Sequence, residues 1–245
     1  MPAAWRSYPI PEAAAKACAR RIAELLDEAL TSQDSATLAL SGGTTARALF
    51  ESLAPLGIDW SRVHLFWVDE RAVAPDHALS NYRLAAERLI LPARVPSGNV
   101  HRIHGELAPQ AAAKAYAEEI RRHFGLGPGE LPAFHVVYLG MGADAHTAGL
   151  FPDEPLLEDR SGIAADVFVR KLGQWRITLL PGSLLAARQA VFLVTGTDKA
   201  PAVRAFFEEP HNPLQFPAQL LRGRPATWFL DAAAASLLGG HDQPA

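Results

Sequence analysis

A carboxylate and an imidazole stand two residues apart in a part of the chain where ligand chemistry is expected. Asp144 and His146 follow Gly140-Met141-Gly142, which itself follows the apolar run Phe134 to Leu139. Glycines after a buried strand open a crevice at the carboxyl edge of an α/β sheet, where ligands bind. An imidazole with an ordinary pKa of about 6.5 suits proton transfer near neutral pH. The segment therefore predicts a proton-transfer site in which Asp144 orients or polarises His146.

A second cluster is made of small and hydroxyl-bearing residues. The run Ser41-Gly42-Gly43-Thr44-Thr45 lies between a predicted strand and a predicted helix. Small residues let backbone amides approach an anion, and a helix N-terminus adds partial positive charge. The run lacks the lysine of a P-loop, which disfavours a nucleoside triphosphate. Two interpretations stay open: a phosphate cradle, or a capped helix start with Thr44 as the N-cap residue.

Charged side chains fall near the ends of three more predicted elements. Asp69-Glu70-Arg71 follows an apolar strand, with Ser80-Asn81-Tyr82 shortly after it, and Arg176 begins another strand. Lys199 falls in the first turn of a predicted helix, where a cation opposes the helix dipole and a bound anion would offset that cost. The alternative for each of these groups is a solvated loop or a side chain that extends to water.

Predicted helices and strands alternate along the chain. The predicted helices span residues 11–30, 44–53, 80–91, 109–124 and 199–207, and the predicted strands span 37–40, 63–68, 134–139, 175–180, 190–195 and 226–230. Strands separated by helices predict an α/β fold with a parallel sheet covered on both faces. The stretch Gly125 to Pro132 is the best linker candidate, but similar strands flank it, so a single domain over residues 1–245 is predicted.

Composition excludes several classes of function. The formal net charge of −3 gives no broad basic surface for nucleic acid. A single cysteine, Cys18, rules out an internal disulfide and is expected in the core. No signal peptide or membrane-length apolar run is evident, so a cytoplasmic protein is expected. His101 and His104 lie close together, but no third ligand clusters with them in the sequence, so no metal site is predicted.

The sequence does not support two common enzyme motifs. Gly140 to Ala145 matches the dinucleotide pattern G-x-G-x-x-A, but Pro152 restricts the helix that this pattern requires. The chain has no G-x-S-x-G nucleophile elbow, so no covalent nucleophile is evident.

Five short motifs, in order, resemble the 6-phosphogluconolactonase family. They are Ser41-Gly42-Gly43-Thr44; Asp69-Glu70-Arg71 with Ser80-Asn81-Tyr82; Gly140-Met141-Gly142 through Asp144-x-His146 to Leu150-Phe151-Pro152; Arg176-Ile177-Thr178-Leu179; and Gly196-x-x-Lys199. The resemblance implies a Rossmann-like three-layer α/β/α fold with a mostly parallel sheet. It also implies cofactor-free hydrolysis of 6-phospho-D-glucono-1,5-lactone in the oxidative pentose phosphate pathway. It leaves the oligomeric state open.

With that substrate, each cluster acquires an expected role. His146 is expected to act as general base, with Asp144 setting its tautomer or orientation. Arg71 and loop amides near Gly142 are expected to stabilise the oxyanion, with Asp69 holding Arg71 in place. The phosphate is expected in the cradle, near Arg176 and Lys199, and Asn81 is a further expected substrate-binding residue.

Two other functions fit the sequence less well than lactone hydrolysis does. Glucosamine-6-phosphate deaminases carry a glutamate where this chain has Leu150-Phe151-Pro152, so the carboxylate is missing. A non-catalytic sugar-phosphate-binding domain would usually be fused to a helix-turn-helix, for which the first 35 residues hold too few helices. The chain departs from the lactonase pattern at Ala145, usually Gly, and at Gly149, usually Ser. Ala145 would be strained if that turn needs a positive φ.

Overall fold

The fold is built on a long parallel sheet. The structure, a computed structural model, describes residues 4–239. Its seven-stranded sheet has the order β1-β10-β9-β6-β2-β3-β5, and each neighbouring pair runs parallel. The strands are β1 (Ala4–Tyr8), β2 (Ala36–Leu40), β3 (Val63–Trp67), β5 (Val100–His101), β6 (Val136–Leu139), β9 (Gln189–Val194) and β10 (Ala226–Asp231). The predicted α/β class and mostly parallel sheet are confirmed.

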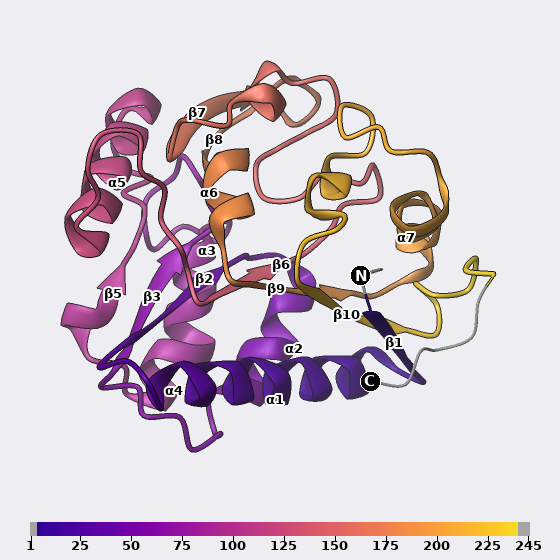
Figure 1. The fold of residues 1–245 in the computed structure, drawn as a ribbon, viewed down its shortest axis with the longest axis horizontal. Helices are drawn as coiled ribbons and strands as arrows, with labels where there is room; N and C mark the ends of the chain where they lie inside the picture. The colour runs from indigo at the N-terminus through magenta and orange to yellow at the C-terminus, as the bar shows by residue number, and fades with distance from the viewer. Residues whose placement is uncertain (1–3, 240–245) are drawn as a thin grey trace.

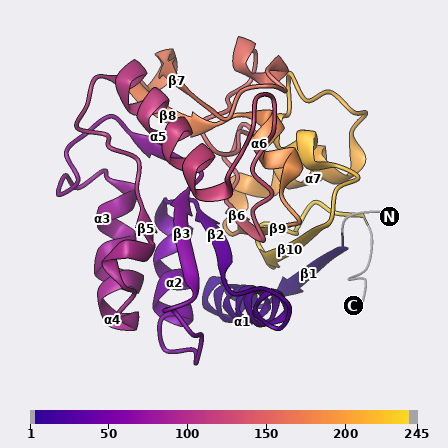
Figure 2. The ribbon, with the colours of Figure 1, turned by 60° about the vertical axis from the view of Figure 1, so that its left-hand side comes forward.

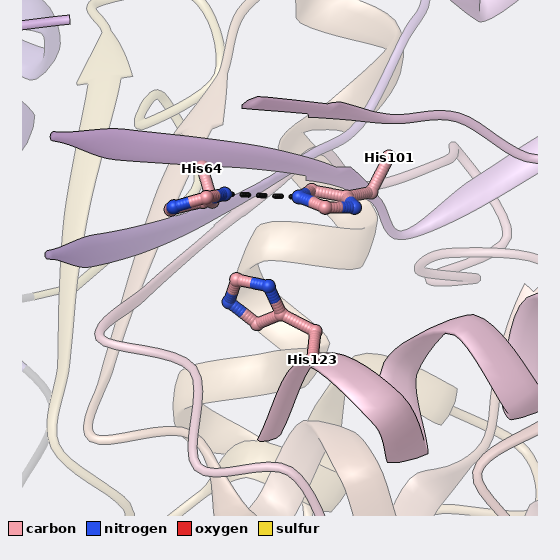
Figure 3. A group of neighbouring side chains, drawn as sticks. All are labelled: His64, His101 and His123. Atoms are coloured by element: carbon pink, nitrogen blue, oxygen red, sulfur yellow. Dashed lines mark hydrogen bonds between the residues drawn. The ribbon is translucent and has the colours of Figure 1, made fainter. Parts of the chain in front are cut away.

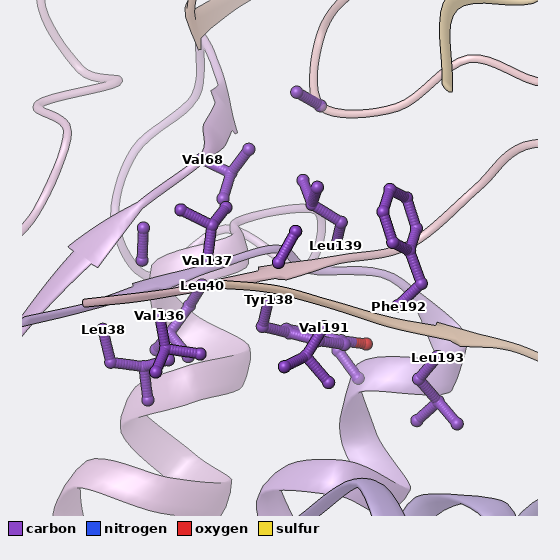
Figure 4. Packing of buried hydrophobic residues seen from close by; sticks show 14 of the residues in the cluster. Leu38, Leu40, Val68, Val136, Val137, Tyr138, Leu139, Val191, Phe192 and Leu193 are labelled. Atoms are coloured by element: carbon purple, nitrogen blue, oxygen red, sulfur yellow. The ribbon is translucent and has the colours of Figure 1, made fainter. Parts of the chain in front are cut away.

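Continuous apolar runs explain why the central strands are buried on both faces. Every residue of β2 and of β6 is buried. In Figure 4, Leu38, Val136 and Val191 point to one side of the sheet, while Val137, Leu139 and Phe192 point to the other. A strand with apolar side chains on both faces needs a covering layer on each, as parallel sheets in α/β proteins have.

Helices form those two layers (Figures 1 and 2). One layer holds α1 (Pro11–Leu30), α2 (Thr44–Leu53) and the segment α3 (Asn81–Ala85), η1 (Ala86–Ile90) and α4 (Leu91–Ala93). The other holds α5 (Pro109–Phe124), α6 (Pro181–Ala186) and α7 (Ala200–Glu208). Cys18 is buried in α1, as predicted. The short helical turns are η2 (Ser97–Asn99), η3 (Pro155–Glu158), η4 (Arg170–Leu172), η5 (Thr197–Lys199) and η6 (Pro217–Leu221).

A small second sheet was not predicted. The strand predicted over residues 175–180 is β8 (Gln174–Leu179), and it lies outside the main sheet. It pairs antiparallel with β4 (Asp69–Arg71) and β7 (Ala164–Val169). A connection remains between the two sheets, because the Leu179 amide donates to the Val68 carbonyl over 2.7 Å. This small sheet places residues of β4 and β8 beyond the carboxyl end of β3.

Three local details of the helices differ from the expectations. The N-cap residue of α2 is Gly43, with φ +99° and no side-chain capping bond, so Thr44 is the first helical residue and not the cap. The predicted helix over residues 80–91 is interrupted by the π-helical turn η1. Lys199 ends the 3₁₀ turn η5 and precedes α7, where a first-turn position was predicted. Within residues 4–239, we found no helix that is long and apolar enough to cross a membrane.

Candidate active site

The predicted clusters come together in one pocket at the carboxyl edge of the main sheet. Every predicted site residue except Asp144 lines this pocket, and Asp144 contacts one that does, His146. The pocket is lined by Ser41, Gly42, Gly43, Thr44, Thr45, Asp69, Arg71, Asn81, Tyr138, Gly140, Met141, Gly142, His146, Thr147, Ala148, Arg176 and Lys199. Five segments of the chain therefore contribute to one concave polar surface.

His146 is held from several directions. Its Nδ1 lies 2.5 Å from Asp144 Oδ1, its carbonyl accepts from the Gly142 amide over 2.9 Å, and its ring stacks on Phe151 at 4.2 Å. A Cβ on Gly142 would lie only 2.0 Å from His146 Nδ1, so this turn needs glycine for the close approach. Because Nδ1 donates to Asp144, Nε2 is the nitrogen left for a ligand.

The electrostatic surroundings keep the His146 imidazole neutral. Burial lowers the pKa of His146 to about 4, and the cations of Arg176, Lys199 and Arg71 act in the same direction. The Asp69 carboxylate opposes them but does not prevail. A neutral imidazole with a free Nε2 can accept a proton at pH 7, which is what a general base must do.

Lys171 is a site neighbour that the sequence analysis missed. Its ammonium group pairs with Asp144 Oδ2, and its Nζ lies 4.7 Å from the Phe151 ring centroid. Lys171 belongs to the turn between β7 and β8, a hairpin of the small sheet that was not predicted. No local motif marks this lysine, so only the fold reveals it.

Asp69 and Arg176 form a buried ion pair. Arg176 Nη1 lies 3.0 Å from Asp69 Oδ2, and the two side chains are 9% and 6% exposed. The antiparallel register of β4 and β8 places these strands side by side. Asp69 was expected to hold Arg71, and the link runs through Asn81, whose Nδ2 donates to the Asp69 carbonyl over 2.8 Å. Arg71 Nη1 instead donates to the Leu79 carbonyl over 2.8 Å and to Asn81 Oδ1 over 2.5 Å.

Glu70 organises the loop that carries Asn81. It is buried, and Oε1 accepts from the amides of Arg71 and Asn81 over 2.8 and 2.7 Å. Its Oε2 accepts from Ser80 Oγ over 3.0 Å and from the Tyr82 amide over 2.7 Å. The sequence indicated Glu70 only as part of a motif, but four donors converging on one buried carboxylate make it the residue that positions this loop.

The cradle segment lies directly against the loop that carries Asn81, because a Cβ on Gly42 would lie only 1.8 Å from Asn81 Oδ1. Gly43 caps α2 with positive φ, so the segment turns sharply into the helix N-terminus. Thr45 Oγ1 lies 3.5 Å from Thr195 Oγ1, which joins the cradle to the end of β9. Lys199 Nζ lies 3.0 Å from Asp198 Oδ2, but Asp198 is mostly exposed, so the lysine stays available to a bound anion.

Comparison with known proteins agrees with this arrangement. Residues 9–229 match the model of the family described as glucosamine-6-phosphate isomerases/6-phosphogluconolactonase. The chain belongs to this family. A 6-phosphogluconolactonase of Nostoc sp. is 37% identical over 215 residues, covering 87% of this chain and 89% of its own. The human 6-phosphogluconolactonase is 39% identical over 210 residues, covering 82% of this chain and 80% of its own.

Solved structures agree with the family assignment. The 6-phosphogluconolactonase of Trypanosoma brucei superposes with a TM-score of 0.84 at 26% identity, covering 97% of this chain and 99% of its own. A monomeric glucosamine-6-phosphate deaminase superposes with a TM-score of 0.80 at 19% identity, over 96% and 100% of the two chains. The second likeness shows a common fold alone. The resemblance predicted from the five motifs is confirmed.

The two departures from the family pattern have different local consequences. Ala145 has φ +61°, so the expected strain is present at this turn. Gly149 has no such φ, but a Cβ there would lie 2.8 Å from Thr178 Cβ, and its amide donates to Thr178 Oγ1 over 2.9 Å. A serine would crowd Thr178 in this chain, so glycine suits the local packing.

A histidine cluster outside the pocket corrects one prediction. No third ligand was expected near His101 and His104. His104 indeed lies apart, but His64, His101 and His123 bring their ring nitrogens within 4.8 Å of one another (Figure 3). The three residues are 37 and 22 positions apart in the chain, so no spacing motif reveals the cluster.

Proposed function

We propose that the protein hydrolyses 6-phospho-D-glucono-1,5-lactone to 6-phosphogluconate, as a carboxylic ester hydrolase of the oxidative pentose phosphate pathway. The observation that carries the proposal is the neutral His146 imidazole, oriented by Asp144, in the pocket that also holds Lys199 and Arg176. Family membership supports it, since relatives named 6-phosphogluconolactonase share most of their length with this chain.

The reaction needs one proton acceptor and no cofactor. His146 Nε2 takes a proton from a water molecule as the water oxygen bonds to the lactone carbonyl carbon. The tetrahedral intermediate then collapses, the bond from that carbon to the ring oxygen breaks, and the imidazolium returns the proton to the leaving alkoxide. Asp144 stabilises the imidazolium and keeps Nδ1 protonated throughout.

Charge that develops on the carbonyl oxygen needs a donor. The Gly142 amide was one candidate, but it donates to the His146 carbonyl and is not free for this role. Arg71 is the stronger candidate, because Asn81 and the Leu79 carbonyl hold its guanidinium at the pocket wall. A fixed cation aimed at the oxyanion stabilises the transition state more than the ground state.

The substrate phosphate is assigned to the cradle segment, Ser41 to Thr45. The segment Ser41 to Thr45 offers hydroxyls and the N-terminus of α2, and Lys199 supplies a cation at the pocket wall. Arg176 supplies a second cation, though its Nη1 already pairs with Asp69. Holding the phosphate away from the reacting carbonyl fixes the orientation of the lactone.

Phe151 argues against the deaminase alternative. It stands where deaminases carry a glutamate, it is buried, and its ring lies against His146. An aromatic ring cannot exchange protons, so an aldose-ketose isomerisation lacks this acid-base group. We further propose that residues 1–245 act as one lactonase domain, since one continuous core joins both helical layers to the main sheet. We also propose that this domain acts in the cytoplasm.

Three measurements on one preparation separate the three candidate functions: lactone loss, ammonia release and binding of 6-phosphogluconate. Freshly generated lactone is followed with and without the protein, and the spontaneous rate is subtracted. Ammonia release from glucosamine 6-phosphate is measured on the same preparation. Accelerated lactone loss without ammonia supports the proposal. Ammonia release without lactone loss identifies a deaminase, and binding of 6-phosphogluconate with neither activity identifies a sugar-phosphate-binding domain.

A further inference from the structure

Three histidines from three elements meet on one side of the main sheet. His64 lies on β3, His101 on the two-residue edge strand β5, and His123 near the end of α5. His64 Nδ1 lies 2.9 Å from His101 Nε2, and the His123 ring centroid is 4.6 and 4.8 Å from the other two (Figure 3). None of the three lines the pocket that holds His146.

The protonation state of the cluster suits metal binding. Burial, aided by the neighbouring histidines, lowers the pKa of His123 to about 4, and burial lowers the pKa of His64 as well. Neutral imidazoles present lone pairs, which a metal ion requires. Among residues 4–239, the His123 ring receives no hydrogen bond, so its nitrogens are available to a ligand.

A second set of contacts orients His101. Its Nδ1 donates to Glu119 Oε1 over 2.7 Å, and Glu119 Oε2 accepts from Arg122 over 2.9 Å. The lone pair of His101 is therefore on Nε2, where it accepts a hydrogen bond from His64 Nδ1 over 2.9 Å. A metal ion would replace this hydrogen bond, with the His64 proton moving to its Nε2. Phe66 stacks on His101 at 4.4 Å and 8°, which fixes the ring plane. A carboxylate behind a histidine is the usual arrangement around protein-bound transition metals.

We propose that His64, His101 and His123 form a zinc-binding site that clamps α5 to the β3–β5 edge of the main sheet. Three imidazoles select Zn²⁺ and similar transition ions over Mg²⁺ or Ca²⁺, which prefer oxygen ligands. Tetrahedral Zn²⁺ with bonds of about 2.0–2.1 Å places its nitrogen ligands about 3.3 Å apart. Small side-chain rotations bring nitrogens within 4.8 Å to that spacing. A water molecule would complete the fourth position.

The clamp has a structural rationale in this fold. The edge strand β5 has only two residues, and α5 packs on β7 and β8 as well as facing this edge. Tyr116 of α5 already bonds to the backbone of Trp67 over 2.7 and 2.8 Å. Glu119 of α5 also bonds to His101 of β5. A metal would add a further attachment of α5 to the main sheet, on the helix that also supports the small sheet carrying Arg176.

Zinc titration of the full chain tests the proposal. Chelator-treated protein is titrated with ZnCl₂ by calorimetry, and its melting temperature is followed. Wild type is expected to bind one Zn²⁺ at this site and to melt at a higher temperature with zinc. His123→Ala should lose this binding, while the matched control His104→Ala should keep it, because His104 lies outside the cluster.

Two further variants separate this site from its alternatives. His146→Ala removes the pocket imidazole and should leave cluster binding intact. Glu119→Gln keeps all three ligands but should weaken zinc binding about 10- to 100-fold, a loss that a purely structural role for Glu119 would not cause. This variant also keeps the test valid if His123→Ala fails to fold. Absence of zinc binding in wild type, equal binding in His123→Ala, or loss of binding in His146→Ala alone would overturn the proposal.

Discussion

At the scale of single residues, the protonation state of His146 makes the sharpest prediction. An ordinary imidazole with a pKa near 6.5 would be mostly protonated at pH 5.5, and a base of that kind would lose about tenfold in activity there. Burial and three nearby cations instead lower the pKa of His146 to about 4. We therefore expect kcat to stay within about twofold between pH 7.5 and 5.5.

The measurement should use kcat at saturating lactone. The substrate phosphate itself titrates near pH 6, so KM is expected to change for reasons unrelated to His146. A kcat that falls about tenfold by pH 5.5 would show that the imidazole is not shielded as described.

Removal of the His146 side chain should affect chemistry more than folding. We expect His146→Ala to lower kcat by about two to four orders of magnitude, because the water loses its proton acceptor. Binding of 6-phosphogluconate and the melting temperature should change little, since the ring is held mainly by Asp144 and Phe151 at the pocket wall. A well-folded variant that turns over near the parent rate would refute the assignment.

The two phosphate-side cations should behave differently when removed. Lys199 forms its ion pair with an exposed carboxylate, so Lys199→Ala should weaken 6-phosphogluconate binding about tenfold or more without lowering the melting temperature. Arg176→Ala should also lower the melting temperature, because it leaves the buried Asp69 carboxylate unpaired. Calorimetry and thermal melts measure both effects, with exposed Lys114→Ala as the control. Unchanged affinity in both variants would exclude them as phosphate ligands.

At the scale of elements, the periodic spacing of apolar residues predicted the long helices well, whereas short strands and their pairing were not predictable. The helices α1, α2 and α5 begin and end where their apolar spacing and flanking prolines or glycines predicted. The strands β4 and β5 are three and two residues long, too short to show any alternation. The sequence of β8 predicts a strand, but no feature of that sequence indicates that the strand pairs with β4 and β7.

The sequence predicted which residues form the site better than it predicted which of them contact one another. Residues that follow strands gather at one sheet edge for topological reasons, so Ser41, Asp69, His146 and Lys199 could be grouped in advance. Which carboxylate pairs with which arginine depends on register within the small sheet. The pairing of Asp69 with Arg176 and the contact of Lys171 with Asp144 were therefore beyond sequence reasoning.

The turn that carries His146 is strained, and relief of that strain is measurable. Ala145 has φ +61°, a conformation that costs a non-glycine residue roughly 1–2 kcal/mol. Ala145→Gly removes this cost but adds about 0.4–1 kcal/mol of unfolded-state entropy. The net expectation is a gain in unfolding free energy of between about 0 and 1.6 kcal/mol. The exposed helical residue Ala111 gives the contrast, since Ala111→Gly should lose about 1 kcal/mol. Urea unfolding midpoints of the two variants test this expectation. If Ala145→Gly lowers the unfolding free energy as much as Ala111→Gly does, the turn is not strained.

At the scale of the whole molecule, buried histidines tie stability to pH. His135 joins β6 to β2, where its Nδ1 accepts from the Thr37 amide over 3.1 Å, and burial together with Arg188 lowers its pKa. The pKa of His146 is lowered to about 4. The unfolded chain protonates both groups near pH 6.5, but the folded chain does so only at lower pH. Stability from these groups is therefore complete above pH 6.5 and is lost as the pH falls, by up to about 1.4 kcal/mol per pH unit for each group.

Urea unfolding between pH 7.5 and 5 should show this loss in the intact protein. The range stays above pH 4.5, so that ordinary carboxylates contribute little to the slope. A chelator keeps the His64 cluster free of metal, in which state the lowered pKa values of His64 and His123 act in the same direction. His135→Gln removes one titrating group and should make the dependence shallower, whereas exposed His211→Gln should leave it unchanged. A wild-type midpoint that is constant or rises toward pH 5 would mean that the fold accepts protons on these histidines as readily as the unfolded chain does.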